Sequence, residues 1–327
     1  MRALVCKELA PVESLVIDNN WAEPKVGAGD VLLAVKSASL NFPDTLIIEG
    51  KYQTKPELPF VPGAECAGVI EAVGEGVSQF KVGDKVMHIG THGCFSEKLV
   101  APAAAIIPMP EGLSFNQAAG IGMTYFTSYH ALKQRANIQT GETILVLGAG
   151  GGVGIAAVEI AKAMGATVIA AASSDEKLAL AKSKGADHLI NYETQSLKDQ
   201  VKAICGRKGV DVIYDPVGGD FSEAALRCMA WNGRFLVVGF ASGPIPKIPL
   251  NLALLKGCQI VGVFWGAFVA MEPQVQQQNV KELWAMFASG QLEAVVTDVY
   301  PLDQYVDAFN CLTQRRAKGK VILEIAL

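Results

Sequence analysis

The sequence of 327 residues predicts a two-domain α/β protein, with a doubly wound parallel sheet in one domain and a mostly antiparallel, partly open β-barrel in the other. Three observations predict this class. The length exceeds what one hydrophobic core usually holds. Before residue 115 the chain is β-rich and punctuated by Gly and Pro turns. From about residue 143, short apolar runs alternate with helical stretches, which is typical of right-handed βαβ units.

The β-rich domain is predicted from a series of strand-like segments near the N-terminus. They are "RALVCKE", "DVLLAVKSASL", "CAGVIEAVG", "DKVMHI" and "CFSEKLVAP". The tail after Gly290 offers a strand, a helix and a second strand, and we expect it to return to the same domain. We therefore assign residues 1–120 and 292–327 to the β-rich domain.

The parallel sheet is predicted within residues 121–291. Its expected strands are "TILVLG", "TVIAAA", "HLINY", "VDVIYD", "RFLVVGF" and "CQIVGVFW", with helical stretches between most of them. Six strands in two βαβαβ halves give the Rossmann-type, dinucleotide-binding architecture. The last strand, at residues 258–265, should lie at the sheet edge and pair with a second copy of the chain, which predicts a homodimer.

Composition narrows the class of partner. Half of the residues are hydrophobic, 18% are charged, and the net charge is -4 without charge runs, so we expect neither nucleic acid nor a membrane as a partner. Seven cysteines lie far apart with no C-x-x-C pair. Together with the absence of a signal-like N-terminus, this pattern predicts reduced thiols and a cytoplasmic location.

A glycine-rich turn predicts the ligand of the parallel sheet. "VLGAGGGVGIAAVEIAKAMG" follows a strand and opens a helix, and it fits the G-x-G-x-x-G fingerprint in a register that begins at Ala149. In this register Gly151 allows a pyrophosphate to approach, and Gly154 allows the helix to pack on the strand. The residues expected to bind the pyrophosphate are Gly151, Gly152, Val153 and Gly154.

The residues after the second strand indicate which nicotinamide cofactor binds. An acidic residue there would bind the ribose hydroxyls of NAD, but Ala170–Ala172 are small and neutral. Ser173, Ser174 and Lys177 follow, and they could donate to a 2'-phosphate, so NADPH is predicted. Alternatively, Lys177 only lies on a solvated helix face. Asp175 and Glu176 fit the first turn of a helix, with their side chains in solvent.

The chain resembles the zinc-independent quinone oxidoreductase (zeta-crystallin-like) branch of the medium-chain dehydrogenase/reductase superfamily. The motifs that are similar include "LNFPDTLIIEGKY", "PFVPGAECAGVIEAVGEGV", "GMTYFTSYHAL", "GAGGGVG", "YDPVGG" and "RAKGKVIL". The resemblance implies a GroES-like fold for the β-rich domain. It also implies that Asn41, Ala64 and Met123 stand where the zinc-dependent relatives have their catalytic ligands, so no metal is expected.

The resemblance further implies roles for three residues near the reacting groups. Asn41 and Tyr52 are placed in the active-site cleft as hydrogen-bond donors, and Thr127 is similar to residues that touch the nicotinamide. Other readings stay open. Asn41 could only cap a helix, and Tyr52 could only pack its ring on the cleft wall. Asp44 is expected to be structural, either capping the helix or pairing with a basic neighbour.

Other residues are placed around the cofactor by the same resemblance. Tyr192 and Arg315 are similar to residues near the adenine ribose phosphate, although Tyr192 could be ordinary strand packing and Arg316 could replace Arg315 in the register. Phe240, Phe264 and Trp265 are expected beside the nicotinamide, or as substrate wall or core.

The predicted activity is hydride transfer from NADPH to a quinone or a conjugated enone without a metal ion. Two alternatives stay open. An enoyl-thioester reductase would need cations for a phosphopantetheine carrier, for which Lys51 and Lys55 are candidates. A non-catalytic NADPH-binding protein is the other.

Overall fold

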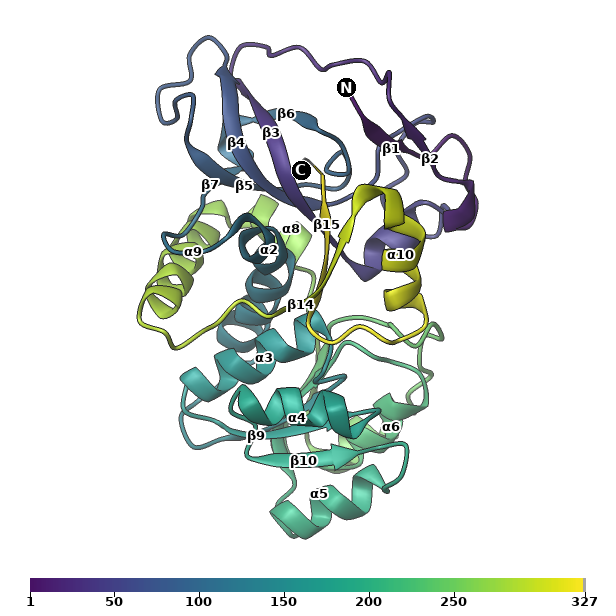
Figure 1. The fold of residues 1–327 in the computed structure, drawn as a ribbon. Coiled ribbons are helices and arrows are strands. Elements are labelled where there is room, and N and C mark those ends of the chain that lie inside the picture. The colour runs from purple at the N-terminus through teal and green to yellow at the C-terminus, as the bar shows by residue number, and fades with distance from the viewer. Residues whose placement is uncertain (326–327) are drawn as a thin grey trace. The chain divides into compact units, whose positions relative to one another are not determined.

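The computed structural model describes residues 1–325 of the protein, in two compact units (Figure 1). Unit 1 contains Met1–Met123 and Ala294–Leu327, and unit 2 contains Thr124–Glu293. Residues 326 and 327, which the predicted first domain includes, lie outside the described residues. The domain boundaries at 120/121 and 291/292 stay a prediction, because a compact unit is not in itself a domain that folds alone.

Unit 2 is built on a six-stranded sheet in which every neighbouring pair is parallel. The strands are β8 (Thr143–Leu147), β9 (Thr167–Ala172), β10 (His188–Asn191), β11 (Val210–Asp215), β12 (Met229–Val237) and β13 (Gln259–Gly262). Their order, β10-β9-β8-β11-β12-β13, runs outward from β8 in both directions. The doubly wound sheet predicted from the sequence is confirmed, with β13 at one edge.

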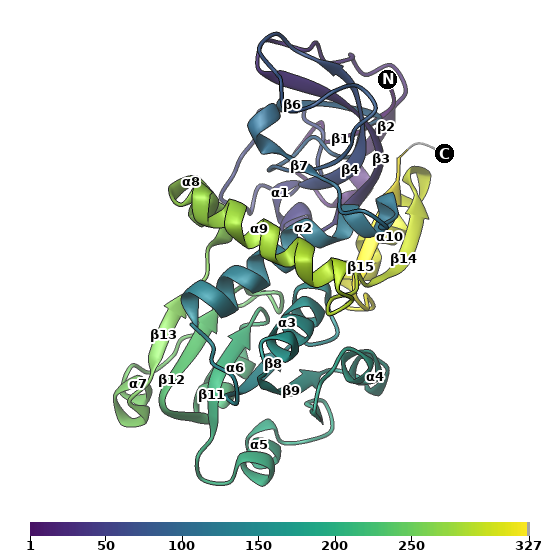
Figure 2. The same ribbon diagram turned by 90° about the vertical axis from the view of Figure 1, so that its left-hand side faces the viewer.

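Helices cover both faces of this sheet (Figure 2). They are α3 (Gly152–Ala163), α4 (Asp175–Ser183), α5 (Leu197–Cys205), α6 (Asp220–Leu226) and α7 (Asn251–Lys256). Because side chains alternate along a strand, Leu145 and Leu147 of β8 lie on one face and share a buried core with Val201 of α5 and Leu226 of α6. Helices α3 and α4 contact β8, β9 and β10.

The starts of two helices follow directly from local sequence. The Ser174 hydroxyl accepts a hydrogen bond from the backbone N–H of Lys177, and the Ser196 hydroxyl accepts one from Asp199. Each serine therefore satisfies one of the backbone donors that a helix start leaves without a partner. Helix α5 ends at Cys205 and is followed by its C-cap residue Gly206, whose φ of 62° is a conformation that favours glycine.

Three further helices lack a clear sequence signal. They are α2 (Phe115–His130), which continues as a π-helical segment at Ala131–Arg135, α8 (Trp265–Met271) and α9 (Pro273–Ala288). The division between the units falls within α2. Helix α9 buries Gln276 and Asn279 as well as Leu283, and the Asn279 side chain accepts from Gln134 Nε2 at 2.8 Å. Its buried face is partly polar, so no apolar stripe predicts it.

Unit 1 contains a seven-stranded, mostly antiparallel sheet and a two-stranded ribbon. The ribbon is β1 (Ala3–Val5) with β2 (Val16–Asp18), and the sheet contains β3 (Asp30–Leu40), β4 (Glu65–Val73), β5 (Lys85–Ile89), β6 (Lys98–Pro102), β7 (Ile106–Pro108), β14 (Val296–Pro301) and β15 (Lys320–Glu324). The strand order is β14-β15-β3-β4-β5-β7, with β6 paired to β3. The β-rich, GroES-like prediction is confirmed. The C-terminal strands β14 and β15 extend this sheet, because β15 pairs with β3.

The core of unit 1 lies between this sheet and two helices. Helix α1 (Phe42–Ile47) and helix α10 (Tyr305–Thr313) contribute Ile47 and Phe309 to a buried cluster that includes Phe95 and Leu323. The rings of Phe95 and Phe309 meet edge to face with centroids 6.2 Å apart. Short 3-10 segments at Val12–Ser14, Ala103–Ala105 and Leu302–Gln304 complete the unit.

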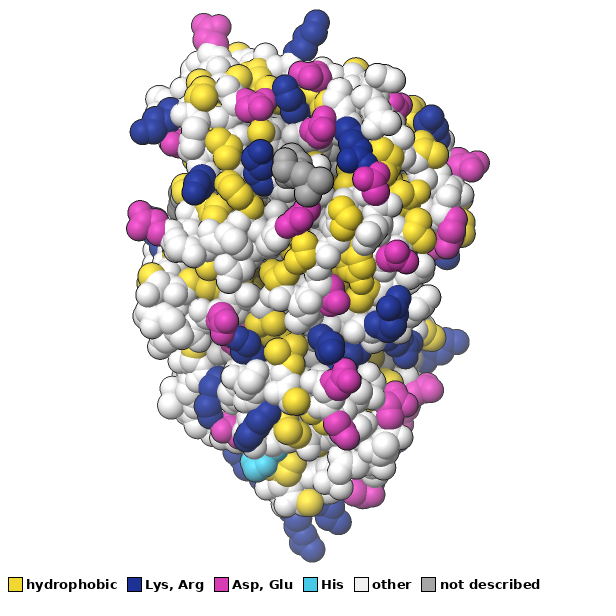
Figure 3. Space-filling model, in the orientation of Figure 1, with side chains coloured by type: hydrophobic (Ala, Val, Ile, Leu, Met, Phe, Trp, Pro, Cys, Tyr) yellow, Lys and Arg dark blue, Asp and Glu magenta, His cyan; other side chains and the backbone are white. Residues whose placement is uncertain are grey.

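The surface shows interspersed charge. On the face drawn in Figure 3, Lys and Arg side chains alternate with Asp and Glu side chains, in keeping with a net charge of -4. Among residues 1–325, no helix has the length and the apolar composition needed to cross a membrane.

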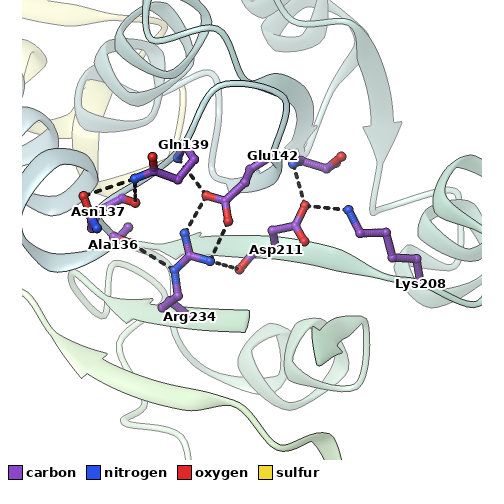
Figure 4. Close-up of polar contacts among 8 residues, drawn as sticks. Ala136, Asn137, Gln139, Glu142, Lys208, Asp211 and Arg234 are labelled. Carbon is purple, nitrogen blue, oxygen red and sulfur yellow. Dashed lines mark hydrogen bonds and ion pairs between the residues drawn. The ribbon is translucent and has the colours of Figure 1, made fainter. Parts of the chain in front are cut away.

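A group of charged side chains joins three strands at the amino end of the parallel sheet (Figure 4). Arg234 of β12 binds both carboxylate oxygens of Glu142, at 2.8 and 2.6 Å, and its Nε donates to the carbonyl of Ala136. Asp211 of β11 accepts from the backbone N–H of Thr143, the first residue of β8. Burial alone would raise the pKa of Glu142, but the hydrogen bonds from Arg234 and the backbone lower it below its ordinary value.

We expect Arg234→Met to reduce the free energy of unfolding of the protein by about 3 kcal/mol, since it leaves a largely buried carboxylate without its bidentate partner. The measurement is urea denaturation at neutral pH. Arg227→Met is the matched control, because Arg227 pairs with Glu223 on the exposed surface, and its loss should cost about 0.5 kcal/mol. Equal losses in the two variants would contradict the assignment.

The same ion pair predicts a dependence on pH. A lowered folded-state pKa means that the stabilisation by Glu142 is present above the ordinary carboxyl pKa of about 4 and is lost as the pH falls through the lowered value. This acid-dependent loss of stability should be smaller in Arg234→Met than in the native protein.

Candidate functional site

The glycine-rich turn links β8 to α3. Gly148 has a φ of 59°, which a side chain would disfavour, so the tight turn is made there, one residue before Ala149. The N–H of Gly151 donates to the carbonyl of Gly148 at 3.0 Å. A Cβ at residue 154 would lie 2.2 Å from that same carbonyl oxygen, so Gly154 has the packing role predicted for it.

Gly151 is different, because the protein itself does not require a glycine there. A Cβ at this position would meet the Gly148 oxygen at an ordinary 3.6 Å and nothing closer. The backbone amides of Gly152, Val153 and Gly154 form the first turn of the 12-residue helix α3, where N–H groups have no partner within the helix. An open glycine beside such amides fits a phosphate group.

Lys177 lies across this turn rather than on a solvated helix face. A Cβ at Gly150 would be 2.4 Å from the Lys177 Cβ, and the Lys177 ammonium donates to the Ser173 hydroxyl at 3.4 Å. Ala172, the last residue of β9, is buried, and Ser174 is the N-cap of α4. Two hydroxyls and an ammonium therefore lie around the end of β9, where an NAD-binding site would have an acidic residue.

The other predicted residues of unit 2 include two aromatic side chains that follow strands of the sheet. Tyr192 comes directly after β10, its N–H donates to the carbonyl of Ala172, and its ring packs on Phe221 with centroids 4.5 Å apart. Phe240 follows β12 and packs over Gly218. Parallel strands end at one edge, so both aromatic residues lie at the same edge as the glycine-rich turn.

Phe264 and Trp265 follow β13 at that edge. Phe264 is 62% exposed, whereas Trp265 is half-buried against Phe126 and donates from Nε1 to the side chain of Gln276 at 3.2 Å. Trp265 is therefore at least partly a packing residue. Thr127 lies half-buried on α2, next to Ser128, whose hydroxyl donates to the carbonyl of Val153.

In unit 1, Asn41 is the N-cap residue of α1, but its side chain has other partners. Its Oδ1 accepts from the Lys320 ammonium at 2.7 Å, and its Nδ2 donates to Glu65 Oε1 at 2.8 Å. Asp44, as expected, is structural at the helix start, because its carboxylate accepts from the Asn41 backbone N–H at 2.7 Å. Burial raises the pKa of Asp44 to about 7, although this hydrogen bond opposes the rise.

Tyr52 is half-buried and packs against the core of unit 1. Burial raises the pKa of its phenol, and the nearby Asp44 raises it further. The hydroxyl therefore carries its proton at neutral pH, as a hydrogen-bond donor must. Arg315 follows α10 in unit 1, exposed and with a φ of 57°, and its role at a ribose phosphate stays a prediction.

Comparisons with known proteins identify the family. A family model described as "Alcohol dehydrogenase GroES-like domain" matches residues 27–111, and one described as "Zinc-binding dehydrogenase" matches residues 152–289. The "Quinone oxidoreductase-like protein 2 homolog" of Nematostella vectensis is 40% identical over 98% of this chain and 88% of its own. The chain belongs to the quinone oxidoreductase branch of the medium-chain dehydrogenase/reductase superfamily.

Solved structures of this quinone oxidoreductase branch have the same fold. The quinone oxidoreductase of Pseudomonas syringae pv. tomato is 34% identical, covers 99% of each chain and superposes with a TM-score of 0.92. That of Escherichia coli, solved in complex with NADPH, is 28% identical, covers 99% of this chain and all of its own, and has a TM-score of 0.91.

The resemblance places Asn41, Ala64 and Met123 where metal-dependent relatives have metal ligands. These residues offer an amide, a methyl group and a thioether. Over residues 1–325, no three His, Cys, Asp or Glu side chains are arranged to hold a metal ion. Glu65 and Lys320, which were not predicted from the sequence, bind one another at 2.9 Å beside Asn41. Each is a charged residue at the first position of a strand, followed by a run of apolar residues.

Proposed function

We propose that the chain is an NADPH-dependent reductase that transfers hydride to a quinone or a conjugated enone without a metal ion. One correspondence carries the proposal: by resemblance, Asn41, Ala64 and Met123 stand at the places of the catalytic zinc ligands in metal-dependent relatives. Without a Lewis acid, alcohol oxidation lacks a cation for its alkoxide. Quinones and enones are already electron-poor, so they can accept hydride without one.

The residues of unit 2 fit the cofactor. The amides of Gly152, Val153 and Gly154 would hold the pyrophosphate, and Ser173 and Lys177 would bind the 2'-phosphate. The Escherichia coli relative was solved with NADPH, which supports the assignment. Bound NADPH supplies a hydride, and the acceptor takes up this hydride and one proton.

The residues of unit 1 would act on the acceptor. Asn41 and Tyr52 are proposed to donate hydrogen bonds to the oxygen on which negative charge develops, and Tyr52 also to deliver the proton. The raised pKa of Tyr52 keeps its proton available at neutral pH. Seven free thiols fit a reducing compartment, and we propose a cytoplasmic location.

An acceptor panel tests the activity. We expect NADPH oxidation with quinones or enones, no stoichiometric zinc by elemental analysis, and no loss of activity with a chelator. Turnover with enoyl-CoA alone would instead indicate an enoyl-thioester reductase, although Lys51 is already paired with Glu49. NADPH binding without oxidation by any acceptor would indicate a non-catalytic protein.

The cofactor preference should depend on Lys177. We expect Lys177→Ala to raise the KM for NADPH by about tenfold or more, as the loss of one charge-assisted hydrogen bond predicts, and to leave NADH kinetics almost unchanged. Ala172→Asp should shift the preference toward NADH by repelling the 2'-phosphate. The control is Lys182→Ala, at the exposed end of α4. Equal effects of Lys177→Ala on the two cofactors would refute this assignment.

We also propose a homodimer formed through β13. This edge strand is flanked by exposed apolar side chains, among them Trp231, Leu250 and Leu254, which are 73%, 77% and 79% exposed. A second copy would satisfy the unpaired edge and cover these groups.

Light scattering should then report a dimer at micromolar concentration, and Ile260→Glu on β13 should produce monomers by placing a charge in the contact. Leu189→Glu is the matched control, since Leu189 lies on the opposite edge strand with similar exposure, 38% against 41%. A native monomer, or dissociation by both substitutions, would exclude this interface.

A further inference from the structure

A buried ion pair organises the ends of several segments in unit 1. We refer to Ser39, Asn41, Glu65 and Lys320 as the Lys320 cluster. The Lys320 ammonium, on a residue only 5% exposed, donates to Glu65 Oε1 at 2.9 Å, to Asn41 Oδ1 at 2.7 Å and to the carbonyl of Leu40 at 3.1 Å. All three of its donors are therefore used within the protein.

The Glu65 carboxylate is equally well satisfied. Its Oε1 accepts from the Ser39 hydroxyl, from Asn41 Nδ2 and from Lys320, and its Oε2 accepts from the backbone N–H of Met123 at 2.7 Å. The cluster thus joins the end of β3, the start of β4, helix α2 and the start of β15.

Two glycines of α2 leave room for this pair. A Cβ at Gly122 would lie 3.1 Å from Glu65 Oε2 and closer still to Ile89, and a Cβ at Gly120 would lie 3.3 Å from the Lys320 stem. Burying two charges costs several kcal/mol in desolvation, and well-packed apolar residues are often at least as stable. A contribution to folding stability is therefore not a sufficient reason for this buried ion pair.

The position of the pair suggests another reason. Asn41 binds the ammonium directly, Glu65 follows Ala64 in the chain, and the Met123 backbone donates to Glu65. Of the three places that the resemblance matches to metal ligands, Asn41 contacts the ammonium directly, whereas Ala64 and Met123 are linked to it through Glu65.

We propose that Lys320 is a positioning residue for acceptor reduction, whose positive charge organises and polarises Asn41 where metal-dependent relatives use a cation. The inference rests on the proposed function. Lys320 acts through Asn41: an ammonium at 2.7 Å from Oδ1 withdraws electron density from the amide and strengthens its N–H donors.

One of the two Asn41 Nδ2 hydrogens makes only a long contact within the protein. One Nδ2 hydrogen is used by Glu65 at 2.8 Å, whereas the other contact, to the carbonyl of Ser39, is 3.5 Å long and at the limit of a hydrogen bond. This second N–H is the group that would stabilise negative charge on the acceptor oxygen. The strength of the hydrogen bond that this N–H donates depends on the positive charge of Lys320.

The decisive variant removes both charges together. Lys320→Met alone would leave a buried, unpaired carboxylate and could fail to fold for that reason. Lys320→Met/Glu65→Gln removes the positive and the negative charge together, so no unpaired charge is left buried. A loss of activity in this variant then reports the loss of the charge beside Asn41 rather than a failure to fold. The matched control is Lys98→Met, which removes a lysine of unit 1 from a surface pair with Glu23.

We expect the double variant to keep a native-like Tm and an unchanged Kd for NADPH by fluorescence titration, and to lose at least about tenfold in kcat, as weakening one oxyanion donor predicts. Lys98→Met should change none of these quantities. A double variant with native kcat would overturn the proposal.

If the double variant does not fold, Asn41→Ala replaces it. This substitution leaves Lys320 and Glu65 paired but removes the group through which Lys320 acts, so kcat should fall by at least the same factor. Native kcat in a folded Asn41→Ala protein would also overturn the proposal. Failure of the proposed function is distinct, because the native protein would then bind NADPH but reduce no acceptor.

Discussion

The start of α3 approaches the end of β8 so closely that residue 154 has no room for a side chain. The Gly148 carbonyl oxygen, 2.2 Å from where a Cβ would lie, fixes where the helix begins relative to the strand. The free amides of the first turn are thereby placed at the carboxyl edge of a parallel sheet. Since all strands of such a sheet end at one edge, the segments after β9, β10, β12 and β13 are brought to the same place.

Features that depend on neighbours in sequence could be predicted. The strands of unit 2 and the glycine-rich turn are local, because each rests on the pattern of apolar residues or on backbone freedom. Helix α9 could not be predicted in this way. Its buried Gln276 and Asn279 are polar, and Asn279 is satisfied by Gln134, which lies 145 residues away in the chain.

The candidate site likewise contains residues that local sequence predicts and residues whose contacts are distant in the chain. The distance from the fingerprint predicts Lys177, and the structure adds that its stem crosses Gly150 and that its ammonium donates to the Ser173 hydroxyl. For Asn41, a donor role came from family resemblance, whereas its partners Glu65 and Lys320 lie 24 and 279 residues away. No spacing rule connects them, because the contact exists only once β3, β4 and β15 have paired in the order β15-β3-β4.

Glu159 of α3 and Glu65 of β4 are both buried carboxylates, but they are stabilised in different ways. Glu159 of α3 is 4% exposed, and its nearest cation, the Lys184 ammonium, is 3.9 Å away. Burial raises the pKa of Glu159 to about 7, although the hydrogen bond from the Tyr125 hydroxyl opposes the rise. Such a group can relieve the cost of burial by taking up a proton. Glu65 instead receives four hydrogen bonds, one of them from an ammonium at 2.9 Å. All three donors of this ammonium, which belongs to Lys320, are used within the protein, so its position is fixed. A positive charge in a fixed position can stabilise the negative charge that develops in a reaction without reorganisation.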